Sequence, residues 1–239
     1  MREIHFMDSN FISRKEYIQE LCRRILEEKL SLTFCAANGT RLEAVDDEVC
    51  ALLAQAGFYR ANVGIESGSP EVLRRIQKGS RLEQIREKVA LLRKHGIQVV
   101  GNFMLGFPDE TRSQMEKSLE LALSLDLTFA NFWIYVPMPG TRLYEELTRA
   151  GKLPAMPDFR RHDFVSYENA LSELSPPELR RFRNQCMLRF LARPRTVKTL
   201  CELLRSGMFW HSIVERFYWM YIAKYLRAAG RKPSGEAAR

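Results

Sequence analysis

Short apolar runs alternate with longer segments of helical periodicity over the first 150 residues. Runs rich in β-branched and aromatic residues predict five strands, at 3–7, 32–35, 62–65, 98–105 and 129–136. The segments between them carry apolar residues at helical spacing, such as Ile85, Val89 and Leu92. This alternation predicts a parallel sheet with right-handed crossovers, either open or curled into a barrel. The sequence has no P-loop and no GxGxxG after a strand, so nucleotide-binding folds with those signatures lose support.

Capping patterns mark several of the predicted helix starts. Ser80 with Glu83, and Ser175 with Glu178, fit the capping box, in which a hydroxyl and a carboxylate three residues apart satisfy free backbone N–H groups. The first of these predicts a helix that ends near Gly96, and the second predicts a helix that continues to about residue 190.

Residues 158–239 differ from the rest in charge. The whole chain has 37 Lys and Arg against 29 Asp and Glu, a net charge of +8. Residues 158–239 alone hold 16 basic and 8 acidic residues, so residues 1–157 are balanced. We therefore predict two domains, an α/β domain at 1–157 and a basic helical region at 158–239.

The last predicted helix has an aromatic face. Trp210, Val214, Phe217 and Tyr221 follow helical spacing and would share one side. We expect this face to pack on the α/β domain or on a missing upstream domain. Contact with a membrane surface is the alternative. A basic helix alone is a weak signal for nucleic acid, so no nucleic-acid partner is expected.

The composition is that of a globular domain, with 46% hydrophobic and 28% charged residues. No apolar run is long enough to span a bilayer, and residues 1–10 lack the apolar stretch of a signal peptide. The five cysteines, at 22, 35, 50, 186 and 201, are widely spaced and include no CxxC pair. This pattern favours reduced thiols in a cytoplasmic protein and no metal site on this chain.

Polar or Gly/Pro-rich residues follow all five predicted strands, at 8–11, 36–39, 66–69, 106–111 and 137–141. Functional residues of parallel α/β folds lie at the carboxyl ends of strands. Because these ends meet at one edge, the five segments would line a rim with hydrogen-bond donors, acceptors and accessible backbone. Such a rim suits a small polar ligand.

Three sequence runs, in a fixed order, resemble the radical S-adenosylmethionine (radical SAM) superfamily. They are GIESGSPEVLRRIQKG (64–79), GNFMLGFPDET (101–111) and VPMPGTRLYEEL (136–147), and the segments 6–11 and 35–48 fit between them. The chain resembles in particular the members with a cobalamin-binding domain, which include methyltransferase-like and magnesium-protoporphyrin cyclase-like enzymes. The resemblance implies an α/β fold, a partial (β/α)6 TIM-like barrel with strands 2–6 present and strand 1 missing, followed by the helical C-terminal region.

The resemblance assigns the first half of a SAM site to two strand ends. Asp8, Ser9 and Asn10 would hold the methionine amino group, with Ser9 standing where relatives often have a second acid. Glu66 and Ser67 would hold the ribose and carboxylate, since a carboxylate accepts hydrogen bonds from both ribose hydroxyls. The alternatives are that Asp8 caps a helix, that Glu66 stabilises a helix dipole, and that Ser67 is only a cap.

The second half of the implied site follows later strands. Lys78 would pair with the SAM carboxylate, unless it is a solvated charge at a helix end. Gly106 and Pro108 would let the backbone approach the adenosine closely, although both also suit any tight turn. Val136 and Pro137 would offer backbone groups to adenine.

The superfamily needs a 4Fe–4S cluster on a CxxxCxxC motif after its first strand, because iron prefers soft thiolate ligands. This sequence has no such motif, and its first strand matches the second strand of the family. We therefore expect a fragment that begins inside the barrel, with strand one, the cluster loop and any cobalamin domain upstream.

Two functions remain open at this point. The first is the SAM-binding part of a transferase-like radical SAM enzyme, which cleaves SAM reductively to a 5′-deoxyadenosyl radical, with cobalamin-dependent methyl transfer or rearrangement. This fragment alone would be inactive, and no residue indicates the substrate. The second is a non-catalytic interaction module whose basic helical tail docks on a partner or a membrane surface.

Overall fold

The computed structural model describes residues 3–8, 10–12, 14–154 and 168–197. The chain divides into two compact units, Met1–Arg193 and Pro194–Arg239. Within the second unit only residues 194–197 are described, and they are helical. The predicted aromatic face at 210–221 lies outside the described residues.

The strands and helices alternate as the sequence predicts. The strands are β1 (Glu3–Phe6), β2 (Thr33–Thr40), β3 (Phe58–Glu66), β4 (Gln98–Leu105) and β5 (Phe129–Ile134). The helices are α1 (Lys15–Glu27), α2 (Asp47–Gln55), α3 (Pro70–Arg75), α4 (Leu82–Lys94), α5 (Arg112–Ser124), α6 (Arg142–Arg149) and α7 (Pro176–Leu191), with a 3-10 turn η1 at Leu42–Ala44.

The five strands form one sheet in the order β1-β2-β3-β4-β5, and every neighbouring pair is parallel. The predicted α/β class and the parallel sheet are confirmed. The sheet is not closed, because β1 and β5 are its two edges. This is the partial barrel expected from the resemblance, and all five strands end at the same edge.

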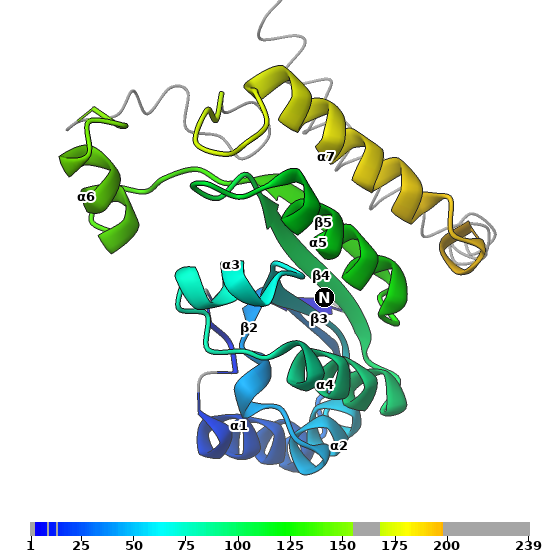
Figure 1. The fold of residues 1–239 in the computed structure, drawn as a ribbon. Helices are drawn as coiled ribbons and strands as arrows, with labels where there is room; N and C mark the ends of the chain where they lie inside the picture. The colour runs from blue at the N-terminus through cyan, green and yellow to red at the C-terminus, as the bar shows by residue number, and fades with distance from the viewer. Residues whose placement is uncertain (1–2, 9, 13, 155–167, 198–239) are drawn as a thin grey trace, which may run out of the picture. The chain divides into compact units, whose positions relative to one another are not determined.

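One face of the sheet is apolar and packs into the hydrophobic core. Val63, Ile65, Phe103 and Phe132 alternate along β3, β4 and β5 and are at most 3% exposed. Helices α1, α2 and α4 lie together on this side of the sheet (Figure 1). Their apolar stripes, predicted from the helical spacing of residues such as Ile85 and Leu92, supply the other half of the core.

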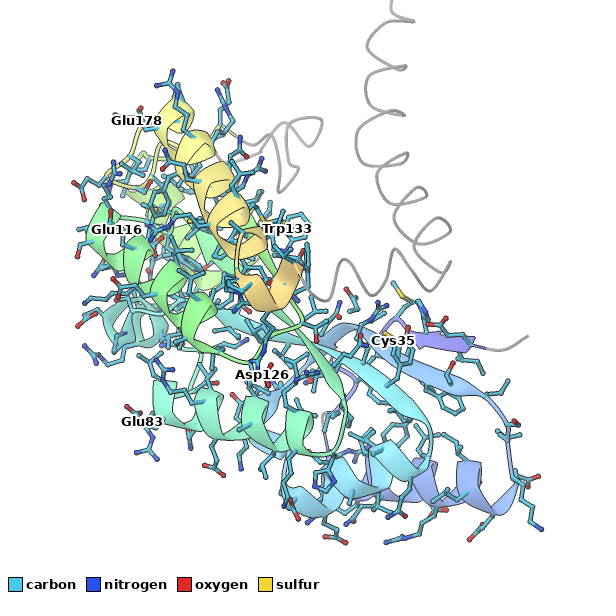
Figure 2. All side chains as sticks on the ribbon, turned by 90° about the vertical axis from the view of Figure 1, so that its right-hand side faces the viewer. Cys35, Glu83, Glu116, Asp126, Trp133 and Glu178 are labelled. Carbon is cyan, nitrogen blue, oxygen red and sulfur yellow. The ribbon has the colours of Figure 1, made fainter. Side chains whose placement is uncertain are left out.

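The opposite face is mixed, with polar residues such as Asn102 and Asn131 next to apolar ones such as Met104 and Trp133. Gly64 of β3 lies opposite Asn102 of β4, which lies opposite Asn131 of β5. The Asn102 side-chain oxygen accepts hydrogen bonds from Asn131 Nδ2 at 2.9 Å and from Trp133 Nε1 at 3.4 Å. Figure 2 shows Cys35 and Trp133 on the side of the sheet away from α1, α2 and α4. This mixed face lies on the inner side of the partial barrel.

Some predicted boundaries are wrong. Strand β2 continues to Thr40, so the segment 36–39 lies inside it rather than after it. An irregularity in the pairing with β3, between Ala36 and Thr40, lets this polar segment remain extended. The predicted capping box at Ser80 is also wrong. The helix begins one residue later, where Gln84 Oε1 accepts from Arg81 N–H at 3.1 Å, and Ser80 instead donates to Glu43.

Helix α7 packs against β5 and α5, and it runs beside α5 in both views (Figures 1 and 2). Its predicted capping box is present, since Ser175 N–H donates to Glu178 Oε2 at 3.0 Å. After it, the Arg193 guanidinium lies 3.6 Å from the Phe190 ring centre and donates to four carbonyls at the end of α5 and just beyond, those of residues 122, 123, 125 and 127. The first unit therefore extends past residue 157, the predicted domain boundary, which itself lies outside the described residues and stays a prediction.

Gly68 in the turn after β3 has a packing role. A Cβ at this position would lie 2.2 Å from the Lys117 carbonyl oxygen of α5, which is backbone and cannot swing aside. The Gly68 N–H also donates to Ser118 Oγ at 2.8 Å. A glycine is therefore needed so that the β3–α3 turn can touch α5.

We predict that Gly68→Ala lowers the free energy of unfolding by about 2 kcal/mol or more, because the turn and α5 must separate. Urea denaturation followed by circular dichroism measures this change. Glu83→Ala, at an exposed position of α4, is the control and should change the value by less than about 0.5 kcal/mol. A Gly68→Ala chain as stable as the wild type would contradict the packing role.

Candidate functional site at the carboxyl edge of the sheet

The end of β3 carries an ion pair on a strained backbone. Glu66 has a φ of 67°, in the left-handed region that non-glycine residues rarely adopt. The Ser67 N–H donates to the Ile65 carbonyl at 2.9 Å, which closes a three-residue γ-turn around Glu66. Strain of this kind persists where the surrounding structure imposes it and often marks a functional residue.

The partner of Glu66 comes from the segment after α3. Lys78 Nζ lies 3.0 Å from Glu66 Oε1, and the two side chains are 26% and 22% exposed. Gly64 makes room for them, since a Cβ there would lie 2.7 Å from Glu66 Oε1 and 3.1 Å from Lys78 Nζ. Two of the predicted site residues are therefore brought together as a pair that is partly open to solvent.

Ser67 points into the protein. It is fully buried, its hydroxyl lies 3.2 Å from Ser118 Oγ, and it accepts from the Ser69 N–H at 3.0 Å. These bonds fasten the β3–α3 turn to α5. The N-cap of α3 is Ser69, whose hydroxyl accepts from the Val72 N–H, so the capping alternative raised for Ser67 is wrong, while its predicted ligand contact remains a prediction.

The segment after β1 lies beside the end of β2. The Phe11 N–H donates to the Gly39 carbonyl at 3.0 Å, and Asn38 Nδ2 donates to the Met7 carbonyl at 3.2 Å. Asp8 is exposed, whereas Asn10 Oδ1 is buried with no hydrogen-bond partner in the described structure. An orphaned acceptor at the sheet edge fits a ligand that donates a hydrogen bond. Ser9 lies outside the described residues.

The loop after β4 is held by a buried carboxylate. Glu110 Oε2 accepts from the Gly106 N–H at 2.7 Å and the Phe107 N–H at 3.0 Å. Glu110 is fully buried, and burial raises its pKa from 4.5 to about 7 although both N–H groups act in the opposite direction. Its other oxygen, Oε1, has no hydrogen-bond partner among the described residues and is where a proton can reside.

Gly106 itself is needed for packing as well as for its turn. Its φ is 87°, and a Cβ would lie 2.6 Å from Leu179 Cδ2 of α7. Pro108 is buried, and its carbonyl accepts a hydrogen bond from the Arg75 guanidinium. The structure thus gives both residues a role within the loop, while their predicted contact with adenosine remains a prediction.

The chain after β5 closes the rim. The Tyr135 N–H donates to the Leu105 carbonyl at 2.9 Å, which extends the pairing of β5 with β4 by one bond. Val136 and Pro137 follow and are buried. The predicted convergence of Asp8, Glu66, Gly106 and Pro137 on one edge is confirmed, because each follows its own strand in a wholly parallel sheet.

Sequence reasoning missed two residues of this edge. Glu110 lies within the run that carries the resemblance, but no pattern indicates that its carboxylate folds back on its own loop. Asn169 comes from the region predicted as a separate helical domain. It donates to the carbonyls of Gly106 and Tyr135, both at 2.8 Å.

The described cysteines do not form a ligand set for an iron–sulfur cluster. Burial raises the pKa of Cys22 to about 11 and the pKa values of Cys50 and Cys186 to about 12, which disfavours the thiolate that iron requires. Cys35, the fourth, accepts a hydrogen bond from Arg60 Nε at 3.1 Å. In the described ranges no three His, Cys, Asp or Glu side chains are grouped as a metal site.

Within the same ranges, no helix combines the length and apolarity that crossing a membrane requires.

Residues 1–122 match the model of the Radical SAM superfamily. The chain therefore belongs to the radical SAM superfamily, and the resemblance carried by the motifs at 64–79 and 101–111 is confirmed.

Curated relatives include several methyltransferases. The chain is 29% identical over 197 residues to an uncharacterized methyltransferase of Pyrococcus horikoshii, covering 82% of this chain and 42% of that protein. It is 31% identical over 143 residues to the bacteriochlorophyllide d C-12(1)-methyltransferase of Chlorobaculum tepidum, covering 59% and 31%. It is 27% identical over 157 residues to the anaerobic magnesium-protoporphyrin IX monomethyl ester cyclase of Rubrivivax gelatinosus, covering 65% and 27%. The chain thus spans less than half the length of these relatives.

Solved structures agree with this assignment. The radical SAM methyltransferase TsrM from Kitasatospora setae, with tryptophan and the SAM analogue aza-SAM bound, is 25% identical with a TM-score of 0.53, covering 61% of this chain and 29% of that one. A second TsrM structure, with cobalamin and a 4Fe–4S cluster bound, is 24% identical with a TM-score of 0.56, covering 75% and 35%, and it shows the same fold.

Glu110 makes the stability of the chain depend on pH in a defined direction. Its pKa is about 7 in the folded state and 4.5 without burial. Between these values the folded state keeps a proton that the unfolded state has lost, so the stabilising contribution falls as pH rises from about 4.5 to about 7. We predict that the free energy of unfolding of wild type relative to Glu110→Gln falls by up to about 3 kcal/mol over this window.

Urea denaturation of both proteins at a series of pH values measures the difference directly. The other carboxylates titrate in both proteins and cancel in the comparison. Glu116→Gln, at an exposed site on the neighbouring helix α5, is the control and should show no such trend. Parallel curves for wild type and Glu110→Gln would show that Glu110 does not titrate in this range.

Proposed function

We propose that this chain is the SAM-binding segment of a radical SAM enzyme of the cobalamin-dependent type, with methyl transfer or a related radical rearrangement as its reaction. The observation that carries the proposal is the partly exposed Glu66–Lys78 pair, held by a strained γ-turn at the edge where the other strand ends also lie. The similarity to methyltransferases over 59–82% of the chain supports this choice of reaction.

The residues at the edge fit the chemistry of SAM. The Lys78 ammonium offers a positive charge for the methionine carboxylate, and the Glu66 carboxylate offers acceptors for the ribose hydroxyls. The orphaned oxygen of Asn10 fits the methionine amino group, which Asp8 and Ser9 are proposed to hold with it. Val136 and Pro137 are proposed to bind adenine through their backbone.

The Glu66–Lys78 pair would have to open when the ligand binds. Each side chain is about one quarter exposed, so exchanging this partner for ligand groups does not bury an unpaired charge. Gly64 lets the two side chains lie at the end of β3, because a Cβ at this position would crowd both of them.

A bound SAM supplies, on reductive cleavage, the 5′-deoxyadenosyl radical that superfamily enzymes use. The cysteines of the described ranges do not fit the cluster that provides the electron, so this chain's own residues account for binding and orientation only. We propose that the cluster ligands and any cobalamin-binding domain belong to other parts of a longer protein.

We predict that the 239-residue chain binds SAM weakly and that Glu66→Gln and Lys78→Ala each weaken the affinity about tenfold, the loss expected for one charge-assisted hydrogen bond. Isothermal titration calorimetry measures this. Glu83→Gln and Lys94→Ala, exposed charges on α4, are matched controls and should bind as wild type does. No binding by the wild type would contradict the proposal and favour the interaction-module alternative.

The same proposal predicts that this chain, reconstituted anaerobically with iron and sulfide, forms no 5′-deoxyadenosine. A longer chain that supplies an in-frame CxxxCxxC motif before residue 1 should form it. Product measured by liquid chromatography from the 239-residue chain alone would show that its own cysteines bind a cluster. Failure of the longer chain with a well-formed cluster would contradict the enzymatic proposal.

A further inference from the structure

One buried amide spans the gap between the ends of β4 and β5. Asn169 Nδ2 donates one hydrogen bond to the Gly106 carbonyl and one to the Tyr135 carbonyl, each at 2.8 Å. A side-chain amide nitrogen carries two hydrogens, so both are used. Asn169 is 1% exposed.

Asn169 is itself held in place by the segment that follows it. Its side-chain oxygen accepts from the Leu171 N–H at 2.8 Å. The Leu171 carbonyl accepts from the Asp109 N–H at 2.8 Å, and the Glu173 N–H donates to the Glu110 carbonyl at 3.0 Å. Residues 169–173 therefore run along the loop that follows β4, and we call this segment the strap.

The bridge lies one residue beyond the last bond of the sheet. The pairing of β4 with β5 ends with the bond from Tyr135 N–H to the Leu105 carbonyl. Beyond this bond, the described residues that follow β4 and β5 form no further ladder pair. The φ angle of Gly106 is 87°, so the backbone turns away from the strand direction. Asn169 continues the link between these segments through the Gly106 carbonyl. The N–H of the same residue, Gly106, donates to Glu110 Oε2 at 2.7 Å.

We propose that Asn169 is a positioning residue for the adenosine part of SAM, acting through the carbonyls of Gly106 and Tyr135 to fix the spacing of the ends of β4 and β5. This inference rests on the proposed function. Asn169 does not touch the ligand, since it is buried and its amide groups all bond to the protein. Its effect reaches the ligand through the backbone of residues 106–108 and 135–137.

The geometry requires an asparagine. An aspartate at this position offers no hydrogen at neutral pH and would place a negative charge beside two carbonyl oxygens. Alanine would remove the hydrogen bond that Asn169 donates to each of these two carbonyls. Both substitutions should let the two strand ends move apart while the sheet itself remains.

The test uses the full 239-residue chain and two probes that contain adenosine, S-adenosylhomocysteine and 5′-methylthioadenosine. Calorimetry at 10 °C, well below the unfolding transition, compares wild type with Asn169→Ala. We expect Asn169→Ala to bind both probes about tenfold more weakly than wild type. The factor should be the same for the two probes, because the substitution affects the adenosine part that they share. Wild type that binds neither probe would overturn the proposed function. Wild type that binds, with Asn169→Ala within twofold of it, would overturn the positioning role alone.

Two further variants separate positioning from loss of stability. Leu174→Ala removes a side chain that is 7% exposed just after the strap and should lower the melting temperature without touching either carbonyl. It should bind both probes within twofold of wild type. Equal weakening in Leu174→Ala and Asn169→Ala would overturn the proposal.

Asn169→Asp adds a pH readout. A protonated carboxyl group can donate one hydrogen bond, so the affinity of Asn169→Asp should rise relative to Asn169→Ala as the pH falls toward 5. Both variants also carry Glu110→Gln, so that the titration of Glu110, which binds the Gly106 N–H, does not contribute to this ratio. A ratio that stays constant between pH 8 and pH 5 would contradict the hydrogen-bonded bridge.

Discussion

Parallel pairing of five consecutive strands is the constraint on which the rest of the structure depends. A parallel neighbour cannot be reached by a short turn, so each strand must be followed by a crossover that returns to the starting edge. The crossovers fill one side of the sheet with helices and leave every strand exit at the same edge. The apolar alternation of β3 to β5 buries one face, and the polar residues of those strands are left on the other. The location of the candidate site is thus a consequence of strand order.

The edge then has to satisfy backbone groups that no longer belong to the sheet. Different strand ends do this in different ways. After β3 the chain closes a γ-turn at Glu66, and both the Ser67 hydroxyl and the Gly68 N–H bond to Ser118 of α5. After β4 the Glu110 carboxylate accepts hydrogen bonds from two N–H groups, and the Asn169 amide donates one to the Gly106 carbonyl. These bonds use most of the polar groups near the turns, and the groups of the described residues that are left for a ligand include the Glu66–Lys78 pair, Asp8 and the orphaned Asn10 oxygen.

The sequence predicts the fold well and the site only in part, for physical reasons. Strand and helix types follow from local periodicity, which is why β4 and the alternation of elements are predicted correctly. The polar segment 36–39 reads as a loop but belongs to β2, where Ala36 pairs with both neighbouring strands and Asn62 Nδ2 donates to the Ala37 carbonyl. Local pattern does not reveal these contacts. Glu66 and Lys78 are found through a run of residues close in sequence. Asn169 acts across 34 and 63 residues of separation from Tyr135 and Gly106, and a lone asparagine in a polar stretch carries no signal of such a contact.

Two glutamates at this edge show how burial divides charge between the fold and the ligand. Glu66 is 22% exposed and paired with a lysine, so its charge remains available to a partner that can replace that lysine. Glu110 is fully buried, and its pKa rises to about 7 because desolvation outweighs two N–H bonds. A carboxylate in that position is costly to ionise, but it holds two adjacent N–H groups of a loop that must turn through a left-handed glycine. The buried Glu110 therefore fixes the loop after β4, and the partly exposed Glu66 faces the solvent. If Glu110 were exposed and Glu66 were buried, the loop would lose its fixed conformation and Glu66 would be a neutral acid. In the proposed SAM site, these two acids therefore have different roles because they differ in solvation.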